Sequence, residues 1–228
     1  MPATHPLSQA FRDTLRNINN AALAAERPPP RLLAVSKTQP ASAVAALAAL
    51  GQRAFGENYV QEAVAKQQAL ADSRLEWHLI GHLQSNKCRA ASEHFDWVQS
   101  LDRIGLISPL GRFRPAGRGP LNVLVQVHVD GEASKSGCAP DAASGLARAI
   151  AAAPNLRLRG VMGIGAPWPD FEQRRDSFRR LCRVFADLRA EFPECDTLSM
   201  GMSEDYPLAI EEGATLVRVG SSLFGPRT

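Results

Sequence analysis

Short apolar runs alternate with longer helical patterns along almost the whole chain. Eight runs rich in Val, Leu and Ile read as buried strands, and the segments between them carry apolar residues at helical spacing. The expected strands are Arg31–Ser36, Arg53–Gly56, Glu76–Ile80, Trp97–Ser100, Asn122–Val129, Arg157–Met162, Thr197–Met200 and Thr215–Val219. The expected helices are Ala41–Leu50, Glu57–Ala71, Ser85–His94, Asp102–Phe113, Pro140–Ala152, Phe171–Glu191 and Glu204–Glu212. Such alternation is typical of parallel strands joined by crossover helices.

A further helix is expected before the first strand. It runs from about Leu7 to Ala25 and ends ahead of Pro28-Pro29-Pro30, because proline cannot continue a helix. No long linker interrupts the remaining pattern. We therefore expect one domain over residues 1–228, in which residues 1–30 form the N-terminal helix and its lead-in.

The length of the chain favours one way of arranging eight strands. A closed (β/α)₈ TIM barrel takes about 250 residues, close to the 228 present, and leaves no unpaired sheet edge. An open doubly wound sheet of eight strands would be unusually wide for one compact domain. The predicted fold is thus α/β, a single TIM barrel with an extra N-terminal helix.

Composition narrows the class of partner. Hydrophobic residues make up 45% of the chain and charged residues 21%, which excludes a disordered or collagen-like chain. The net charge of +3 is too small to make nucleic acid or an anionic membrane the default partner. A small anionic ligand is compatible with it.

The cysteines and the N-terminus predict a compartment. Cys88, Cys138, Cys182 and Cys195 form no Cys-x-x-Cys pair, so neither a zinc site nor a disulfide framework is indicated. The first residues lack the apolar core of a signal peptide, and the run Ala41–Leu50 is too short to span a bilayer. We expect reduced thiols and a cytoplasmic protein.

In a TIM barrel the functional residues follow the carboxyl ends of the strands, which directs attention to Lys37. Strand alternation places Leu33, Val35 and Lys37 on one side. Partial burial of a lysine favours the neutral amine, the form that condenses with an aldehyde to a Schiff base. The alternative is a rim lysine whose ammonium reaches water.

Two glycine-serine segments follow the last two strands. Gly201-Met202-Ser203 comes after the seventh strand and Gly220-Ser221-Ser222 after the eighth, the strands that commonly hold a phosphate. Backbone N–H groups and hydroxyls at such turns bind phosphate without a lysine. Each segment could also be an ordinary turn, with Ser203 as a helix N-cap. Because strand 8 pairs with strand 1 in a closed barrel, Lys37 would lie beside them.

Three further side chains are candidates, each with a simpler alternative. Arg218 shares the side of Gly220, so it points into the barrel mouth or pairs with a carboxylate inside the barrel. Asn58 either contacts a bound ring or caps a helix. His78 and His82 have metal-like spacing only on a helix, and here they flank a strand end, so no metal site is expected.

Four segments are similar to one known family. They are Leu32-Leu33-Ala34-Val35-Ser36-Lys37-Thr38, Phe55-Gly56-Glu57-Asn58-Tyr59-Val60-Gln61-Glu62, Trp77-His78-Leu79-Ile80-Gly81-His82-Leu83-Gln84-Ser85-Asn86-Lys87 and Leu198-Ser199-Met200-Gly201-Met202-Ser203. They resemble the YggS/PROSC family of pyridoxal phosphate homeostasis proteins, and the similarity extends from about Leu32 to the C-terminus.

This resemblance implies a cofactor, pyridoxal 5′-phosphate (PLP), held in a barrel related to the N-terminal domain of alanine racemase (PLP fold type III). It makes Lys37 the Schiff-base lysine, puts Arg218 near the pyridine nitrogen, and leaves no catalytic residue assigned. It implies that the phosphate is held around Ser203, Gly220 and Ser221. Asn58 and His78 would line the pocket.

The resemblance implies a PLP-binding protein of intracellular PLP homeostasis, which buffers PLP or delivers it to PLP-dependent apo-enzymes, without established turnover. A racemase of this fold needs a second acid or base on the opposite face of the substrate, and neither Tyr59 nor Tyr206 is placed there by the sequence. The alternatives are a PLP-dependent amino-acid racemase and a barrel enzyme acting on a phosphorylated sugar. We expect a monomer, because the predicted site is complete in one chain.

Overall fold

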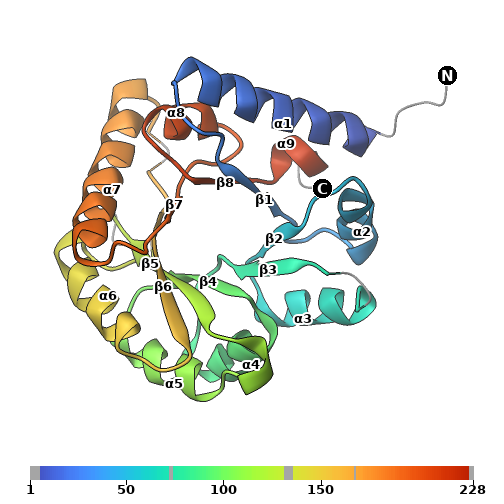
Figure 1. Ribbon diagram of the computed structural model, residues 1–228. Coiled ribbons are helices and arrows are strands. Elements are labelled where there is room, and N and C mark those ends of the chain that lie inside the picture. The colour runs from blue at the N-terminus through green and yellow to red at the C-terminus, as the bar shows by residue number, and fades with distance from the viewer. Residues whose placement is uncertain (1–5, 72–73, 131–135, 167, 226–228) are drawn as a thin grey trace.

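Eight parallel strands form a closed barrel in the computed structural model, which describes residues 6–71, 74–130, 136–166 and 168–225 (Figure 1). Each strand pairs with the next along the chain, and β8 pairs with β1. The strands are β1 (Arg31–Val35), β2 (Ala54–Glu57), β3 (Glu76–Leu79), β4 (Trp97–Leu101), β5 (Leu121–Val127), β6 (Leu156–Gly163), β7 (Thr197–Ser199) and β8 (Leu216–Val219). The predicted barrel is confirmed, and every strand boundary lies within two residues of its expected place.

Helices surround the barrel (Figure 1). They are α1 (Pro6–Ala24), α2 (Ala41–Ala49), α3 (Val60–Ala69), α4 (Cys88–His94), α5 (Ile107–Arg112), α6 (Ala143–Ala151), α7 (Phe171–Glu191), α8 (Tyr206–Glu211) and α9 (Ser221–Phe224). Single 3₁₀ turns are η1 (Ser85–Lys87), η2 (Ile104–Leu106), η3 (Ala116–Arg118) and η4 (Pro140–Ala142). Three of the expected helices thus begin with a 3₁₀ turn, η1, η2 or η4.

Two helix starts and one short helix differ from the sequence expectation. The helix expected from Glu57 begins at Val60, because Glu57 is still the last residue of β2. The helix expected from Glu204 begins at Tyr206. Helix α9 was not expected, because four residues are too few to show helical periodicity.

The strands bury side chains on both faces. Leu33, Ala54 and Leu216 form one small cluster, contributed by the three adjoining strands β1, β2 and β8. A much larger cluster joins the alternate strand residues, such as Leu32 and Phe55, to the helices. Since successive strand residues face opposite sides, the small cluster lies inside the barrel, as does a second one of Trp97, Leu124 and Met162, and the large cluster holds the helices to the outside.

Helix α1 completes the ring of helices. Seven crossovers join eight strands, so no crossover helix covers the seam between β8 and β1. Helix α1 lies across that seam in Figure 1 and packs against α8, α9 and α2. Its buried residues Phe11, Thr14, Ile18 and Ala22 recur every three or four positions, as an amphipathic helix requires.

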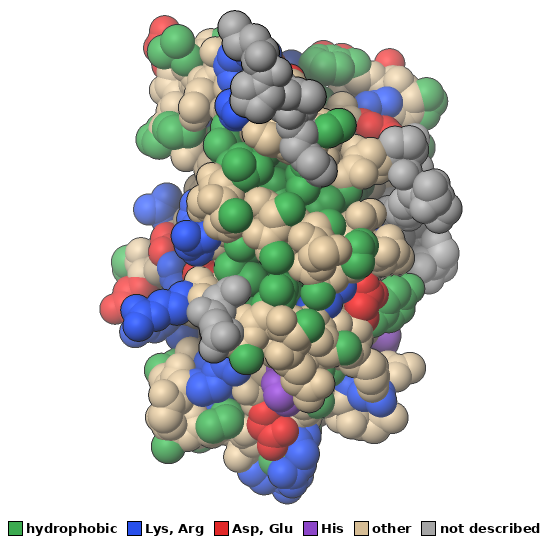
Figure 2. Space-filling model, turned by 90° about the vertical axis from the view of Figure 1, so that its right-hand side faces the viewer, with side chains coloured by type: hydrophobic (Ala, Val, Ile, Leu, Met, Phe, Trp, Pro, Cys, Tyr) green, Lys and Arg blue, Asp and Glu red, His purple; other side chains and the backbone are tan. Residues whose placement is uncertain are grey.

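The surface of the barrel carries mixed side chains (Figure 2), and the thiols form no disulfide. Figure 2, which views the side of the barrel that carries α2 and α3, shows acidic and basic side chains mixed around hydrophobic ones. In the described part of the chain, no helix is both long and apolar enough to cross a membrane. All four cysteines are free, and burial raises the pKa of the Cys138, Cys182 and Cys195 thiols to about 11.

We expect the role of α1 to be measurable with two substitutions on that helix. Ile18 is 2% exposed and Leu23 is 79% exposed. Replacement of Ile18 by Ala should lower the free energy of unfolding by about 2–5 kcal/mol, because it leaves a cavity at the seam. Leu23→Ala should change it by less than about 0.5 kcal/mol. Urea denaturation of both variants measures the difference, and equal midpoints would contradict a packing role for α1.

Candidate functional site

The first and last strands bring Lys37 beside Gly220 at one rim of the barrel. Leu33 pairs with Arg218 and Ala34 with Val219, so the segments that follow β1 and β8 leave the sheet side by side (Figure 1). A Cβ atom on Gly220 would lie only 3.2 Å from the Val35 carbonyl oxygen. Glycine therefore permits the close approach of the two segments. Lys37, two residues beyond Val35, is half-buried.

Two neighbouring segments form a group of residues that we call the serine-glycine cradle. It consists of Ser203 from the segment after β7 and of Gly220, Ser221 and Ser222 from the segment after β8. The Ser203 hydroxyl oxygen accepts hydrogen bonds from the Gly220 N–H (3.2 Å) and the Ser222 N–H (3.5 Å). These N–H groups stand at the amino end of α9, where a helix lacks internal acceptors and attracts anions. The cradle thus joins the segment after β7 to the segment after β8.

The N-cap role considered for Ser203 is wrong. Helix α8 begins at Tyr206, with Asp205 at the N-cap position, and the Ser203 hydroxyl contacts Gly220 and Ser222 instead. Gly201 has φ +86°, and a Cβ there would lie 2.5 Å from Ala209 Cβ. This left-handed turn redirects the chain after β7, so Ser203 reaches across to α9 rather than along α8.

Arg218 lies in the barrel interior next to this rim. It is 4% exposed, and its two terminal nitrogens donate to Ser199 Oγ and to the Gly163 carbonyl oxygen, both at 2.8 Å. Burial lowers the pKa of Arg218 to about 10, against the opposing effect of Asp205, so the guanidinium is still charged at neutral pH. Arg218 therefore donates hydrogen bonds to a hydroxyl oxygen and a carbonyl oxygen, and not to the carboxylate that the sequence analysis considered as its partner.

A chain of hydrogen bonds continues from Arg218 through the interior. Ser199 Oγ donates to Gln99 Oε1 (2.7 Å), and Gln99 Nε2 lies 2.9 Å from His78 Nδ1. His78 Nε2 lies 2.6 Å from Glu76 Oε1. Each of these contacts pairs a donor with an acceptor if His78 is neutral and carries its proton on Nε2.

The surroundings of His78, at the other end of this series of hydrogen bonds, agree with a neutral imidazole ring. Burial lowers the pKa of His78, which favours the neutral ring, and the ring stacks on Trp97 with centroids 5.1 Å apart. Burial alone would raise the pKa of Glu76, but His78 and Arg31 outweigh it and hold that pKa at about 2. Glu76 is thus a carboxylate, and Arg31 bonds it at 2.8 Å.

Arg218 and His78 are candidates from the sequence alone, but the residues that connect them are not. Gln99 and Ser199 are fully buried and lie on β4 and β7. A buried polar residue within an apolar strand was the available signal, because such a group needs a partner. Nothing in one sequence says which strand supplies that partner.

Asn58 follows β2 directly and is half-buried. Tyr59 takes the N-cap position of α3, so helix capping does not account for Asn58. A Cβ atom on Gly81 would lie 2.1 Å from the Asn58 carbonyl oxygen, so the segment after β3 packs tightly on the Asn58 backbone. The predicted contact of Asn58 with a bound ring stays a prediction, as does the pocket-lining role of His78.

The two histidines near β3 have different surroundings. His78 is inside the barrel, whereas His82 Nδ1 is 3.2 Å from Ser136 Oγ and 3.8 Å from Asp102 Oδ2. Among the residues that the structure describes, no three His, Cys, Asp or Glu side chains are grouped to hold a metal ion.

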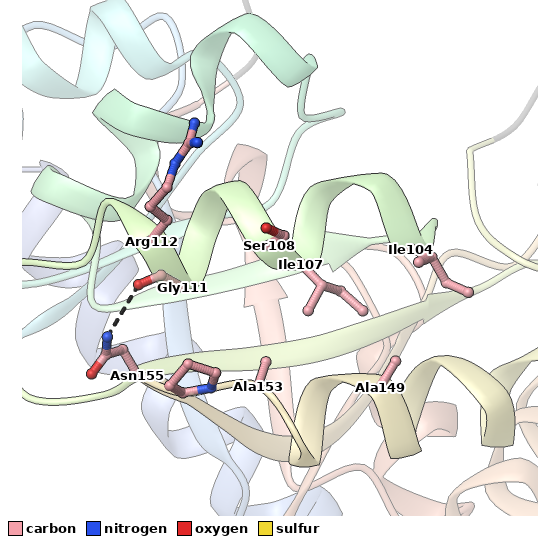
Figure 3. Close-up of a pocket in the computed structure, with 9 residues that line it drawn as sticks. Ile104, Ile107, Ser108, Gly111, Arg112, Ala149, Ala153 and Asn155 are labelled. Atoms are coloured by element: carbon pink, nitrogen blue, oxygen red, sulfur yellow. Dashed lines mark hydrogen bonds between the residues drawn. The ribbon is translucent and has the colours of Figure 1, made fainter.

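A hollow of about 370 Å³ lies between α5 and α6 (Figure 3). Ile104, Ile107, Ala149 and Ala153 give it an apolar lining. These helices stand on the opposite side of the barrel from β1 and β8 (Figure 1), so the hollow is separate from the site at Lys37.

Comparison with known proteins gives consistent results. Residues 9–228 match the family model described as the alanine racemase N-terminal domain. The chain is 54% identical over 212 residues to the pyridoxal phosphate homeostasis protein of Pseudomonas aeruginosa, covering 92% of this chain and 91% of that protein. It is 49% identical over 199 residues to the protein of that name from Escherichia coli K12, covering 86% and 85%.

Known structures agree with the barrel. The structure of PipY from Synechococcus elongatus with PLP bound has 39% identity and a TM-score of 0.78, covering 92% of this chain and 99% of that one. Alanine racemase from Corynebacterium glutamicum has 21% identity and a TM-score of 0.69 and shows the same fold, but this chain covers only 61% of it.

The hydrogen-bonded chain inside the barrel can be tested without any ligand. Gln99→Leu leaves the Ser199 hydroxyl proton without an acceptor and His78 Nδ1 without a donor, so the free energy of unfolding should fall by about 2–4 kcal/mol. Gln67→Leu is the matched control, because the buried Gln67 amide nitrogen has no hydrogen-bond partner in the part of the chain described. It should be neutral or slightly stabilising. Equal losses in urea denaturation would count against the chain of bonds.

Proposed function

Because this chain belongs to the family of pyridoxal phosphate homeostasis proteins, with the alanine racemase N-terminal domain fold, we propose that it binds PLP at the rim formed by β1, β7 and β8. The observation that carries the proposal is the closure of the barrel, which puts an amine at Lys37 beside the serine-glycine cradle. PLP has an aldehyde and a phosphate on one rigid ring, so it needs these two kinds of group close together.

The residues present fit such a ligand. The close approach of Gly220 to Val35 leaves no room for a side chain where the cradle meets β1. A phosphate dianion needs donors more than a counter-ion there, and it would take the place of the Ser203 hydroxyl oxygen as acceptor of the N–H groups at the start of α9. When bound, the cofactor supplies an aldehyde, with which an unprotonated lysine amine condenses to a Schiff base with loss of one water.

Each side chain would have a separate task. Lys37 would hold the ligand covalently, Ser203, Gly220 and Ser221 would surround its phosphate, and Arg218 would face the pyridine nitrogen. Ser199 and Gly163 already bind two of the Arg218 donors, so the guanidinium is fixed in place before any ligand arrives.

A buried arginine opposite the pyridine nitrogen argues against broad catalysis. The guanidinium is a donor and a cation, so it disfavours a proton on that nitrogen and makes the ring a weaker electron sink. A racemase needs a second acid or base as well. Tyr59 is 61% exposed at the start of α3, and Tyr206 is only 6% exposed.

We therefore propose reversible PLP binding, with buffering of PLP or its delivery to apo-enzymes, by a cytoplasmic monomer.

The covalent contact is tested by trapping. Borohydride reduction of the PLP-loaded protein, followed by peptide mass spectrometry, should find the adduct on Lys37. The Lys37→Ala variant should lose the adduct and the absorbance change on PLP titration. An adduct on a different lysine in the wild type, or one that persists in Lys37→Ala, would contradict the proposal.

The absence of turnover has its own experiment. The PLP-loaded protein is incubated in deuterium oxide with a panel of L- and D-amino acids, and deuterium at the α-carbon is followed by proton NMR. We expect no exchange above that of Lys37→Ala incubated with free PLP. Exchange that depends on Lys37 would favour the racemase instead.

A further inference from the structure

A buried ammonium group lies behind the strand end that carries Lys37. Lys66 belongs to α3 and is 5% exposed. Its Nζ donates to the Ser36 carbonyl oxygen, to Glu57 Oε1 and to Glu62 Oε1, each at 2.7 Å. These bonds use all three protons of the ammonium group. We call Lys66, Glu57 and Glu62 the Lys66 cluster.

The Lys66 cluster holds the backbone on both sides of Lys37. On one side, Lys66 binds the Ser36 carbonyl oxygen, and the Ser36 hydroxyl donates to Glu57 Oε1 at 2.6 Å. On the other side, the Thr38 N–H donates to Glu62 Oε1 at 2.6 Å. Lys37 is therefore the residue between two anchored neighbours.

The second anchor holds a strained residue. Thr38 has φ +66°, in the left-handed region that a β-branched residue rarely adopts. Thr38 is exposed, so core packing does not impose this conformation. Such strain persists where other interactions determine the backbone, and it gathers at functional sites. Two interactions in the structure meet this requirement: the bond from Thr38 to Glu62, and the turn bond from the Gln39 N–H to the Ser36 carbonyl oxygen (3.0 Å).

Stability alone does not explain a buried ionic cluster. Burial raises the pKa of Glu57, and Glu57 Oε2 is buried without a hydrogen-bond partner among the described residues. Well-packed apolar side chains in place of a buried ion pair are often at least as stable. What the cluster does supply is a fixed geometry for the segment Ser36–Thr38.

We infer that the Lys66 cluster is a positioning device for Lys37. By holding Ser36 and Thr38, it sets the direction in which the Lys37 side chain leaves the rim toward the serine-glycine cradle. This rests on the proposed covalent binding of PLP by Lys37. Lys66, Glu57 and Glu62 act through Lys37 and are positioning residues.

The two anchors can be separated at Glu62, because its side chain is 26% exposed and does not belong to the apolar core. Glu62→Gln keeps an oxygen to accept from the Thr38 N–H, whereas Glu62→Ala removes it. The rate of Schiff-base formation with PLP, followed by absorbance, should fall about tenfold in Glu62→Ala, as expected for the loss of one hydrogen bond to a charged group. Glu62→Gln should stay within about twofold of the wild type.

The contribution of the Lys66 ammonium group is tested by Lys66→Met, with Arg114→Met as a matched control. Arg114 is also a buried cation that holds carbonyl oxygens, those of Ser92 and Phe95 at 2.7 Å, but it has no contact with the Lys37 segment. Both changes alter the unfolding midpoint. Only Lys66→Met should also slow the reaction with PLP, by about tenfold. If Lys66→Met does not fold, the comparison of Glu62→Ala with Glu62→Gln decides whether the cluster positions Lys37.

A double-mutant cycle excludes a merely structural effect. In a Lys37→Ala background, Glu62→Ala should leave the noncovalent affinity for PLP unchanged, because the cluster acts only through Lys37. An equal loss of affinity in both backgrounds, or wild-type rates in Glu62→Ala, overturns the positioning role and leaves PLP binding intact. A wild-type protein that forms no Lys37 adduct overturns the proposed function together with this inference.

Discussion

Pairing between the first and the last strand is the constraint on which the rest of the structure depends. Without the contact of β1 with β8, Lys37 and Gly220 would be separated by most of the chain and by the width of a sheet. Closure also creates a seam that no crossover helix covers, which explains why a helix precedes β1 and packs there. A single topological requirement thus accounts for the site and for the role of α1.

The sequence predicts the barrel well because hydrophobic periodicity is a local property. It also predicts which side of the sheet Lys37 and Arg218 face, since side chains alternate along a strand. It does not predict Gln99 and Ser199, which bond each other from β4 and β7, 100 positions apart. Partnership between distant polar residues depends on register around the barrel, and one sequence contains no measure of that register.

Lys66 shows a second limit of prediction from the sequence. On a helix, Lys66 follows Val60 and Ala63 at intervals of three, which puts a charged residue on the buried face. Its spacing of four from Glu62 is typical of a surface ion pair, the more common arrangement. Only the burial of Lys66 against Ser36 and Glu57 distinguishes the cluster from that arrangement, and this burial comes from the packing of α3 on β1 and β2.

The polar groups inside this barrel share one physical logic. Arg218 is fixed by Ser199 and Gly163 beneath the rim, and Lys37 is fixed from behind by its anchored neighbours. The Arg218 guanidinium and the Lys66 ammonium group are both buried, charged groups with several bonds, an arrangement that costs desolvation but leaves little conformational freedom. For the proposed binding of PLP, a site ordered in advance loses little entropy on binding, and the affinity depends on the fit of both supports at once.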